Sequence, residues 1–159
     1  MLRLPFYLIA LLAVSTSPAT AADKLAFAPV PAWVVPVPVP SSVKGAADAP
    51  LQPLLLNEQL LFGKGKVTSF TRFAGRILNS QGLSAGNISI PWRPAFDTVT
   101  IHSLHVVRDG KIIDVLGAGQ TFNIMRREAN LESAMPDGVL TANIQPEGPQ
   151  VGDIIDLQV

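Results

Sequence analysis

The chain has only two histidines, His102 and His105, in an H-x-x-H spacing that could hold a metal ion if both lay on one face of a helix. The surrounding residues 98–108 (TVTIHSLHVVR) are rich in β-branched side chains and predict a strand instead. Successive side chains on a strand point to opposite faces, so histidines three positions apart diverge. We therefore expect no metal site here, but one surface histidine and one that is partly buried with a hydrogen-bond partner.

The residues that could work with a histidine in catalysis follow no recognisable pattern. The chain has no cysteine and no G-x-S-x-G motif, so no activated nucleophile is indicated. The aspartates are scattered, without the pairing that glycoside hydrolysis needs and without the D-x-D-x-D-G spacing of a calcium loop. Those in the predicted domain are Asp97, Asp109, Asp114, Asp137, Asp153 and Asp156. The sequence predicts no catalytic residue, no metal site and no cofactor.

Four residues are candidates for an interaction surface. Arg126 and Arg127 form the densest charge run and would point to opposite faces of a strand, so one could reach a carboxylate of a neighbouring domain. The alternative is a solvated strand end. Trp33 and Trp92 could line a sugar-binding face together with other aromatic residues, although aromatic side chains in small β-sandwiches also pack in the core.

The elements that must position these residues are predicted to be strands. Turn signals recur roughly every 8 to 12 residues, as in sandwiches and barrels. The clearest is Asp109-Gly110 between two β-branched runs, which indicates a hairpin with a type I′ turn. One helix-like stretch lies at 128–135. The predicted fold is an all-β antiparallel β-sandwich with strands at 54–62, 66–79, 87–92, 98–108, 111–116, 120–127, 139–145 and 154–159.

The last strand ends within its alternating pattern. In 154–159 (IIDLQV) the residues Ile155, Leu157 and Val159 alternate with Asp156 and Gln158. A domain rarely stops inside a half-buried strand, so we expect the sandwich to be incomplete at its C-terminal end. The alternative is a final edge strand. An incomplete sheet invites association, so we also expect poor solubility or oligomerisation of the isolated domain.

The N-terminal region predicts export. Residues 1–21 have a basic residue, an apolar run at 4–14 and an Ala19-Thr20-Ala21 cleavage pattern, which is typical of a signal peptide. The apolar run is shorter than the roughly 20 residues of a membrane span, so we expect no span once the signal is cleaved. The protein should be periplasmic or extracellular.

Residues 22–53 are rich in proline and predict an extended arm and linker before the domain at 54–159. The arm is either a tether or an apolar plug, formed by 33–35, that docks on a neighbouring domain. The formal net charge is zero, with acidic and basic residues interspersed, which argues against nucleic-acid binding. Without cysteines, stability must come from packing rather than from disulfides.

Several short motifs together resemble a known family. They are Phe70-Thr71-Arg72, Ile90-Pro91-Trp92, Asp109-Gly110-Lys111 with Ile113-Asp114, Ile124-Met125-Arg126-Arg127-Glu128, Met135-Pro136-Asp137-Gly138-Val139-Leu140-Thr141, and Val151-Gly152-Asp153-Ile154-Ile155. Residues 33–159 resemble the uncharacterised N-terminal domain that precedes bacterial transglutaminase-like domains, domain-of-unknown-function family 3857. The resemblance implies a two-layer antiparallel β fold followed by a papain-like core, whose Cys, His and Asp are not found in this chain.

The resemblance implies a non-catalytic accessory domain of an exported transglutaminase-like protein, with the C-terminal transglutaminase-like domain as its partner. The alternative is a free-standing periplasmic module that binds envelope polysaccharide or peptide. An unrecognised hydrolase that uses His105 with an acidic partner is the least favoured hypothesis.

Overall fold

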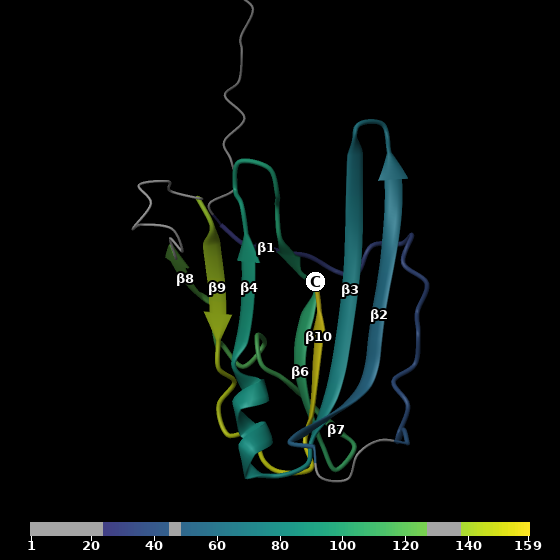
Figure 1. Ribbon diagram of the computed structural model, residues 1–159, viewed down its shortest axis with the longest axis vertical. Coiled ribbons are helices and arrows are strands. Elements are labelled where there is room, and N and C mark those ends of the chain that lie inside the picture. The colour runs from purple at the N-terminus through teal and green to yellow at the C-terminus, as the bar shows by residue number, and fades with distance from the viewer. Residues whose placement is uncertain (1–23, 45–48, 127–137) are drawn as a thin grey trace, which may run out of the picture.

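The computed structural model describes residues 24–44, 49–126 and 138–159 (Figure 1). The predicted signal peptide at 1–21, the helix-like stretch at 128–135 and Arg127 lie outside the described residues. Within the described part, no helix is long and apolar enough to cross a membrane.

Nearly all regular structure in the described residues is β-strand, with one 3₁₀ helix, η1 (Ser80–Gly86). The strands are β1 (Ala26–Phe27), β2 (Leu51–Gly63), β3 (Lys66–Ile77), β4 (Ile88–Trp92), β5 (Thr100–Ile101), β6 (Ser103–Arg108), β7 (Lys111–Asp114), β8 (Asn123–Arg126), β9 (Leu140–Ile144) and β10 (Ile154–Gln158).

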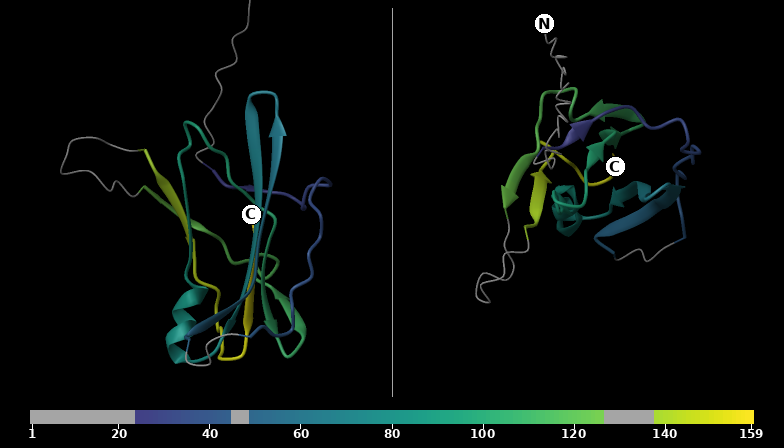
Figure 2. Two further views of the ribbon diagram at one scale, coloured as in Figure 1. Left: turned by 45° about the vertical axis from the view of Figure 1, so that its right-hand side comes forward. Right: turned by 90° about the horizontal axis from the view of Figure 1, so that it is seen from above.

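The strands form two layers. A five-stranded antiparallel sheet has the order β2-β3-β10-β6-β7, and a three-stranded antiparallel sheet has the order β4-β9-β8. Figure 2 shows the two sheets on opposite sides of the molecule. The predicted all-β antiparallel sandwich is confirmed, with one addition: β1 and β5 form a short parallel pair.

Local turn chemistry behaves as predicted at the central hairpin. Asp109 and Gly110 have φ angles of 49° and 76°, the left-handed pair that a type I′ turn requires, and they join β6 to β7. The predicted strand at 98–108 is divided, however. His102 separates β5 from β6 because the strands on its two sides pair with different strands. β5 pairs with β1, and β6 pairs with β10 and β7.

β2 begins at Leu51, before the predicted start at 54, and it includes Pro53. Proline is tolerated there because β2 lies at the edge of the sheet and its register shifts between Pro53 and Leu55. Gly75 on β3 lies directly opposite Pro53. A Cβ atom at Gly75 would lie 2.9 Å from the Phe73 ring, so the close approach needs glycine.

β10 is a central strand, and the alternative of a final edge strand is wrong. It pairs with β3 on one side and with β6 on the other. Its side chains are buried on both faces, with Ile155 and Asp156 exposed by 2% and 6%. The alternation of apolar and polar residues in 154–159 correctly predicts which side chains of β10 face the core. It gave no sign that the outer face is covered as well.

The core fills the lower half of the space between the sheets. Ile155 packs there with residues from β3, β6, β9 and the segment after β7, namely Ile77, Leu104, Val106, Val115 and Ile144. A smaller cluster of Trp92, Leu140 and Ala142 joins β4 to β9. Ile88, Ile90 and Trp92 all point inward, as their alternation predicts.

A buried ion pair closes the lower end of the sandwich. Arg108, at the end of β6, donates to both carboxylate oxygens of Asp153 at 2.9 and 2.7 Å, and it also donates to the carbonyl of Gly148. The Gln150 N–H donates to the same carboxylate. The Arg108 hydrogen bonds, followed by that of Gln150, hold the pKa of Asp153 below its ordinary value despite burial. The pair therefore fixes the loop that leads into β10.

The proline-rich arm lies against the outer face of the five-stranded sheet instead of hanging free. Val34 is buried, and Gln59 on β2 holds both backbone groups of Val35 at 2.9 and 2.7 Å. Arg72 and Arg76 on β3 donate to the carbonyls of Val37 and Ser41. The sequence suggested a tether or a plug for a neighbouring domain, whereas the arm docks on its own domain, with Trp33 half-buried beside Val34.

We predict that Asp153→Asn lowers the melting temperature by roughly 5–10 °C at neutral pH, because the charge-assisted pair with Arg108 is lost. The folded pKa of Asp153 lies below its unfolded value of about 3.9. The stability that the pair contributes is therefore complete above that value and is lost as the pH falls through the folded pKa. The difference in unfolding free energy between wild type and variant should shrink below about pH 4. Asp97→Asn, which breaks an exposed 3.9 Å pair with Arg93, is the matched control and should change little.

We predict that Gln59→Ala speeds amide exchange at Val35 and speeds protease cleavage in the arm, because both hydrogen bonds to Val35 disappear. The global melting temperature should change only slightly. Glu58→Ala alters the next residue on the opposite face of β2 and serves as the control. Equal exchange at Val35 in all three proteins would show that Gln59 does not hold the arm.

Candidate functional site

A hollow in the described surface lies beyond the end of β10. The β2–β3 hairpin continues upward well past this point, and Figure 1 shows the C-terminal residue at the base of the gap beside it. A groove of about 790 Å³ opens there. One wall is formed by residues 65–71 of the hairpin, the other by residues 91–100, and Val159 lies at the base.

The inner face of the upper hairpin carries four exposed apolar side chains, with Glu58 and Ser69 among them. Leu56, Leu60 and Phe62 alternate along β2 and are 73%, 50% and 74% exposed, and Val67 on β3 is 57% exposed. By strand alternation they share the sheet face that packs the core lower down. The three-stranded sheet does not extend over them. Side chains of this kind on one strand face usually meet another layer.

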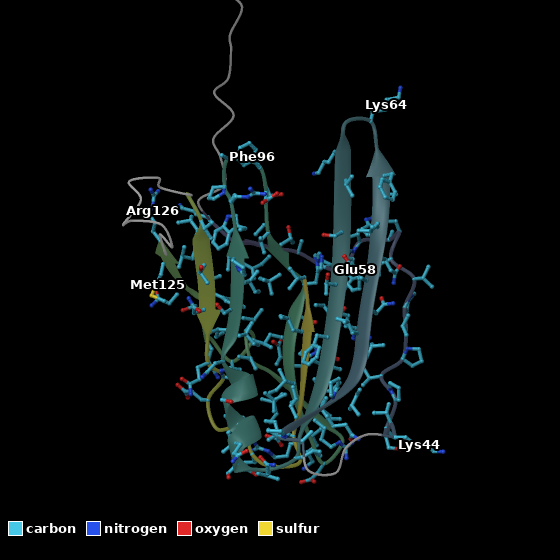
Figure 3. All side chains as sticks on the ribbon, viewed as in Figure 1. Lys44, Glu58, Lys64, Phe96, Met125 and Arg126 are labelled. Carbon is cyan, nitrogen blue, oxygen red and sulfur yellow. The ribbon has the colours of Figure 1, made fainter. Side chains whose placement is uncertain are left out.

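The opposite wall carries two aromatic residues with different roles. Trp92 is 4% exposed and packs in the smaller core cluster, and it also borders the groove. Phe96 is 81% exposed, and the Arg93 guanidinium lies over its ring at 5.5 Å from the centroid. Figure 3 shows Phe96 and Lys64 at the tops of the two walls.

The residues predicted as an interaction surface lie on separate elements. Trp33 is half-buried in the arm, Trp92 is in β4, and Arg126 is exposed at the end of β8, on the outer edge of the three-stranded sheet (Figure 3). At 4% exposure Trp92 is too buried to offer a flat aromatic surface to a ligand. The predicted role of Trp33 and Arg126 stays a prediction.

The two histidines do not form a joint site in the structure. His102 lies between β5 and β6, where its Nδ1 is 2.9 Å from the Ala28 carbonyl and its ring is 5.8 Å from that of Phe70. His105 lies on β6, opposite Asp156 and Asp114 on the neighbouring strands. Among the described residues, no three His, Cys, Asp or Glu side chains come together as a metal site would require.

The strongest electrostatic feature near the groove is an ion pair that the sequence did not suggest. Arg72 on β3 donates to both carboxylate oxygens of Asp156 on β10 at 3.0 and 2.7 Å. These hydrogen bonds raise the pKa of Arg72. The partners are 84 residues apart, so only pairing of β3 with β10 brings them together. Because Arg72 also holds the arm, the pair joins the outer layer to the strand that ends at the groove.

The arrangement is suited to holding a polypeptide more than to transforming a small molecule. The walls are built from strand edges, hydroxyl side chains and apolar side chains, and the two acidic side chains of β10 and its entry loop are each occupied by an arginine.

Comparison with solved structures gives one relative of similar fold, a crystal structure named as a "putative protease" from Parabacteroides distasonis. The match has a TM-score of 0.58 and 16% sequence identity, and it covers 69% of this chain but 22% of that protein. At this identity the likeness concerns the fold alone. No curated protein matches the chain.

The family model of a domain of unknown function with a solved structure, DUF3857, matches residues 63–159. The matched segment starts at the β2–β3 turn and includes every later strand of both sheets. This agrees with the resemblance carried by the hairpin and strand motifs. The chain therefore belongs to the DUF3857 family.

Proposed function

We propose that this chain is the non-catalytic accessory β-sandwich of an exported transglutaminase-like protein, and that it supports a catalytic domain by docking against it. The observation that carries the proposal is the uncovered inner face of the upper β2–β3 hairpin. Leu60 and Phe62 lie there and remain 50% and 74% exposed in this chain. Such a surface fits a permanent neighbour in the same protein better than a transient ligand.

The comparisons support the proposal at the level of the fold and of the family. The chain spans 22% of a larger protein of similar fold that is named as a protease, which is consistent with a domain that works beside a catalytic one. The signal-like pattern at 1–21 supports export. The transglutaminase-like identity of the neighbour comes from the motif resemblance.

A peptide-binding module is the second candidate function. The groove favours peptide over polysaccharide, because its lining offers backbone edges and hydroxyl groups while Trp92 is largely withdrawn into the core. This candidate would gain support if the chain were encoded apart from any catalytic domain.

The proposal predicts that the genomic sequence adjoining this coding region encodes a papain-like domain with a Cys, His, Asp triad in the same reading frame. Sequencing that region checks it directly. An unrelated gene on both sides, with no such domain in any frame, would count strongly against the accessory role and in favour of the peptide-binding module.

We predict that the double substitution Leu60→Ser and Phe62→Ser reduces self-association of the isolated chain, because it removes the largest apolar side chains from the uncovered face. Light scattering and size-exclusion chromatography would measure the change. The same variant should weaken docking to the catalytic domain while leaving the fold intact. Ile112→Ser is the matched control, since Ile112 is 68% exposed on β7 at the other edge of the sheet. Equal effects of the two variants would mean that the hairpin face has no special role.

A further inference from the structure

We propose that the outer face of β2 and β3 is a binding site for an extended polypeptide segment in which valine and proline alternate. Residues 35–43 of the arm are the ligand that the site holds in this structure. Gln59, which binds the arm, lies between Glu58 and Leu60 on β2, so the site is on the opposite face of the hairpin from Leu60 and Phe62. The inference therefore stands apart from the proposed accessory role.

Four polar side chains of the sheet bind the backbone of the arm. Gln59 accepts from the N–H of Val35 at 2.9 Å and donates to the carbonyl of the same residue at 2.7 Å. Three more carbonyls of the arm each accept one hydrogen bond at 2.9 Å, in the pairs Val37–Arg72, Ser41–Arg76 and Val43–Gln52. All five bonds end on the main chain of the arm. Any segment that adopts the same extended backbone can therefore make them.

The bonded residues of the arm recur with a period of two. They are 35, 37, 41 and 43, and an extended strand directs the carbonyls of alternate residues to one side. The first of them binds Gln59 and the last binds Gln52, so the arm runs antiparallel to β2. Figure 1 shows the arm as the blue trace that descends beside β2. The side chains alternate as well: Val37 and Val39 are half-buried, whereas Pro36, Pro38 and Pro40 are exposed.

Proline suits the positions between the bonded residues. It has no N–H, so it leaves no donor without a partner on the exposed side of the arm. Its ring fixes φ, which reduces the conformational entropy that the segment loses when it binds. An extended segment of this kind makes no hydrogen bonds within itself, so its carbonyls are available to the glutamine and arginine donors of the sheet. The site is thus complementary to a valine–proline repeat.

The arm is attached as a ligand rather than as a strand of the sheet. In the described part of the chain, β2 pairs with β3 along its length, and residues 35–43 contribute no strand to the sheet. The contact can therefore be broken and remade without loss of a ladder hydrogen bond. Phe70 and Ala74 lie beside Arg72 on the same outer face and are 3% and 0% exposed, so this face is covered while the arm is bound.

The test separates the arm from the domain after folding. A site for a specific protease replaces residues 45–48, and the full chain is folded and then cut. The cut is needed because a tethered ligand has an effective concentration of the order of millimolar, which a free peptide does not easily match. We expect the cut arm to co-elute with the domain in size-exclusion chromatography, with slow amide exchange at Val35. Excess unlabelled peptide of sequence 33–44 should then speed exchange at Val35 of an isotope-labelled arm.

Two outcomes of the cut would overturn the proposal. Release of the arm from a domain that stays folded would mean that the outer face has no useful affinity for the segment. Unfolding of the domain on cutting would mean that the arm is part of the fold and not a ligand. Circular dichroism of the cut protein distinguishes these two results.

A double variant tests whether the polar side chains hold the segment. Gln52→Ala with Gln59→Ala removes three of the five hydrogen bonds and leaves Arg72 with Asp156. The peptide of sequence 33–44 should bind the cut double variant about tenfold more weakly or less. Glu58→Ala, on the other face of β2, is the control and should bind as the unsubstituted protein does. Equal retention of the arm in the double variant would mean that pairing of β1 with β5 holds it, and would contradict the site.

Peptide variants test the class of ligand. Val37→Ser with Val39→Ser should lower competition by about tenfold, because both side chains are half-buried against the domain. Ser42→Ala, at an exposed position of the arm, is the matched control and should compete as the parent peptide does. Equal competition by the double-serine peptide would show that the site does not select for alternate apolar residues, and it would overturn the valine–proline ligand.

Discussion

The position of β10 in the middle of the five-stranded sheet is the constraint on which the rest of the structure depends. It joins the β2–β3 hairpin to the β6–β7 hairpin, two units that are formed by local turns and otherwise have no common partner in their sheet. Its inner face supplies Ile155 to the core, and its outer face lies under the arm. Because this strand comes last in the sequence, the sheet is complete only when contacts of the largest sequence separation have formed.

Such a strand must place its acidic residues without leaving a buried charge unpaired. Asp153 and Asp156 are exposed by 2% and 6%, and each is held by both ends of an arginine fork. Breaking a buried pair costs far more than the pair contributes in net stability. The two pairs therefore mainly fix the register of β10 against its neighbours. A shift of β10 by one residue would move both carboxylates away from Arg72 and Arg108, and it would turn the apolar residues of β10 outward.

The features that the sequence predicts correctly are those controlled by neighbours in the chain. The Asp109-Gly110 turn follows from its need for positive φ, and the inward side of Ile88, Ile90 and Trp92 follows from alternation. The central place of β10 and its partnership with Arg72 depend on residues 84 positions away, which no local pattern encodes. The docking of the arm could not be predicted from local patterns either. Nothing in the sequence around Gln59 or Val35 indicates that these two residues bind each other. The groove was missed because it is bounded by backbone edges, which carry no residue signature.

Burial explains why the domain has a closed lower half and an open upper half. Below Arg72, the inner side chains of β3, β6 and β10 pack in the larger core cluster. Above it, β3 and β2 continue alone with Leu60, Phe62 and Val67 in solvent, although burying a side chain of this size stabilises by about 1.5–3 kcal/mol. A two-stranded hairpin is at best marginally stable by itself in water. The upper hairpin is thus a surface whose apolar residues would gain stability from burial against another body.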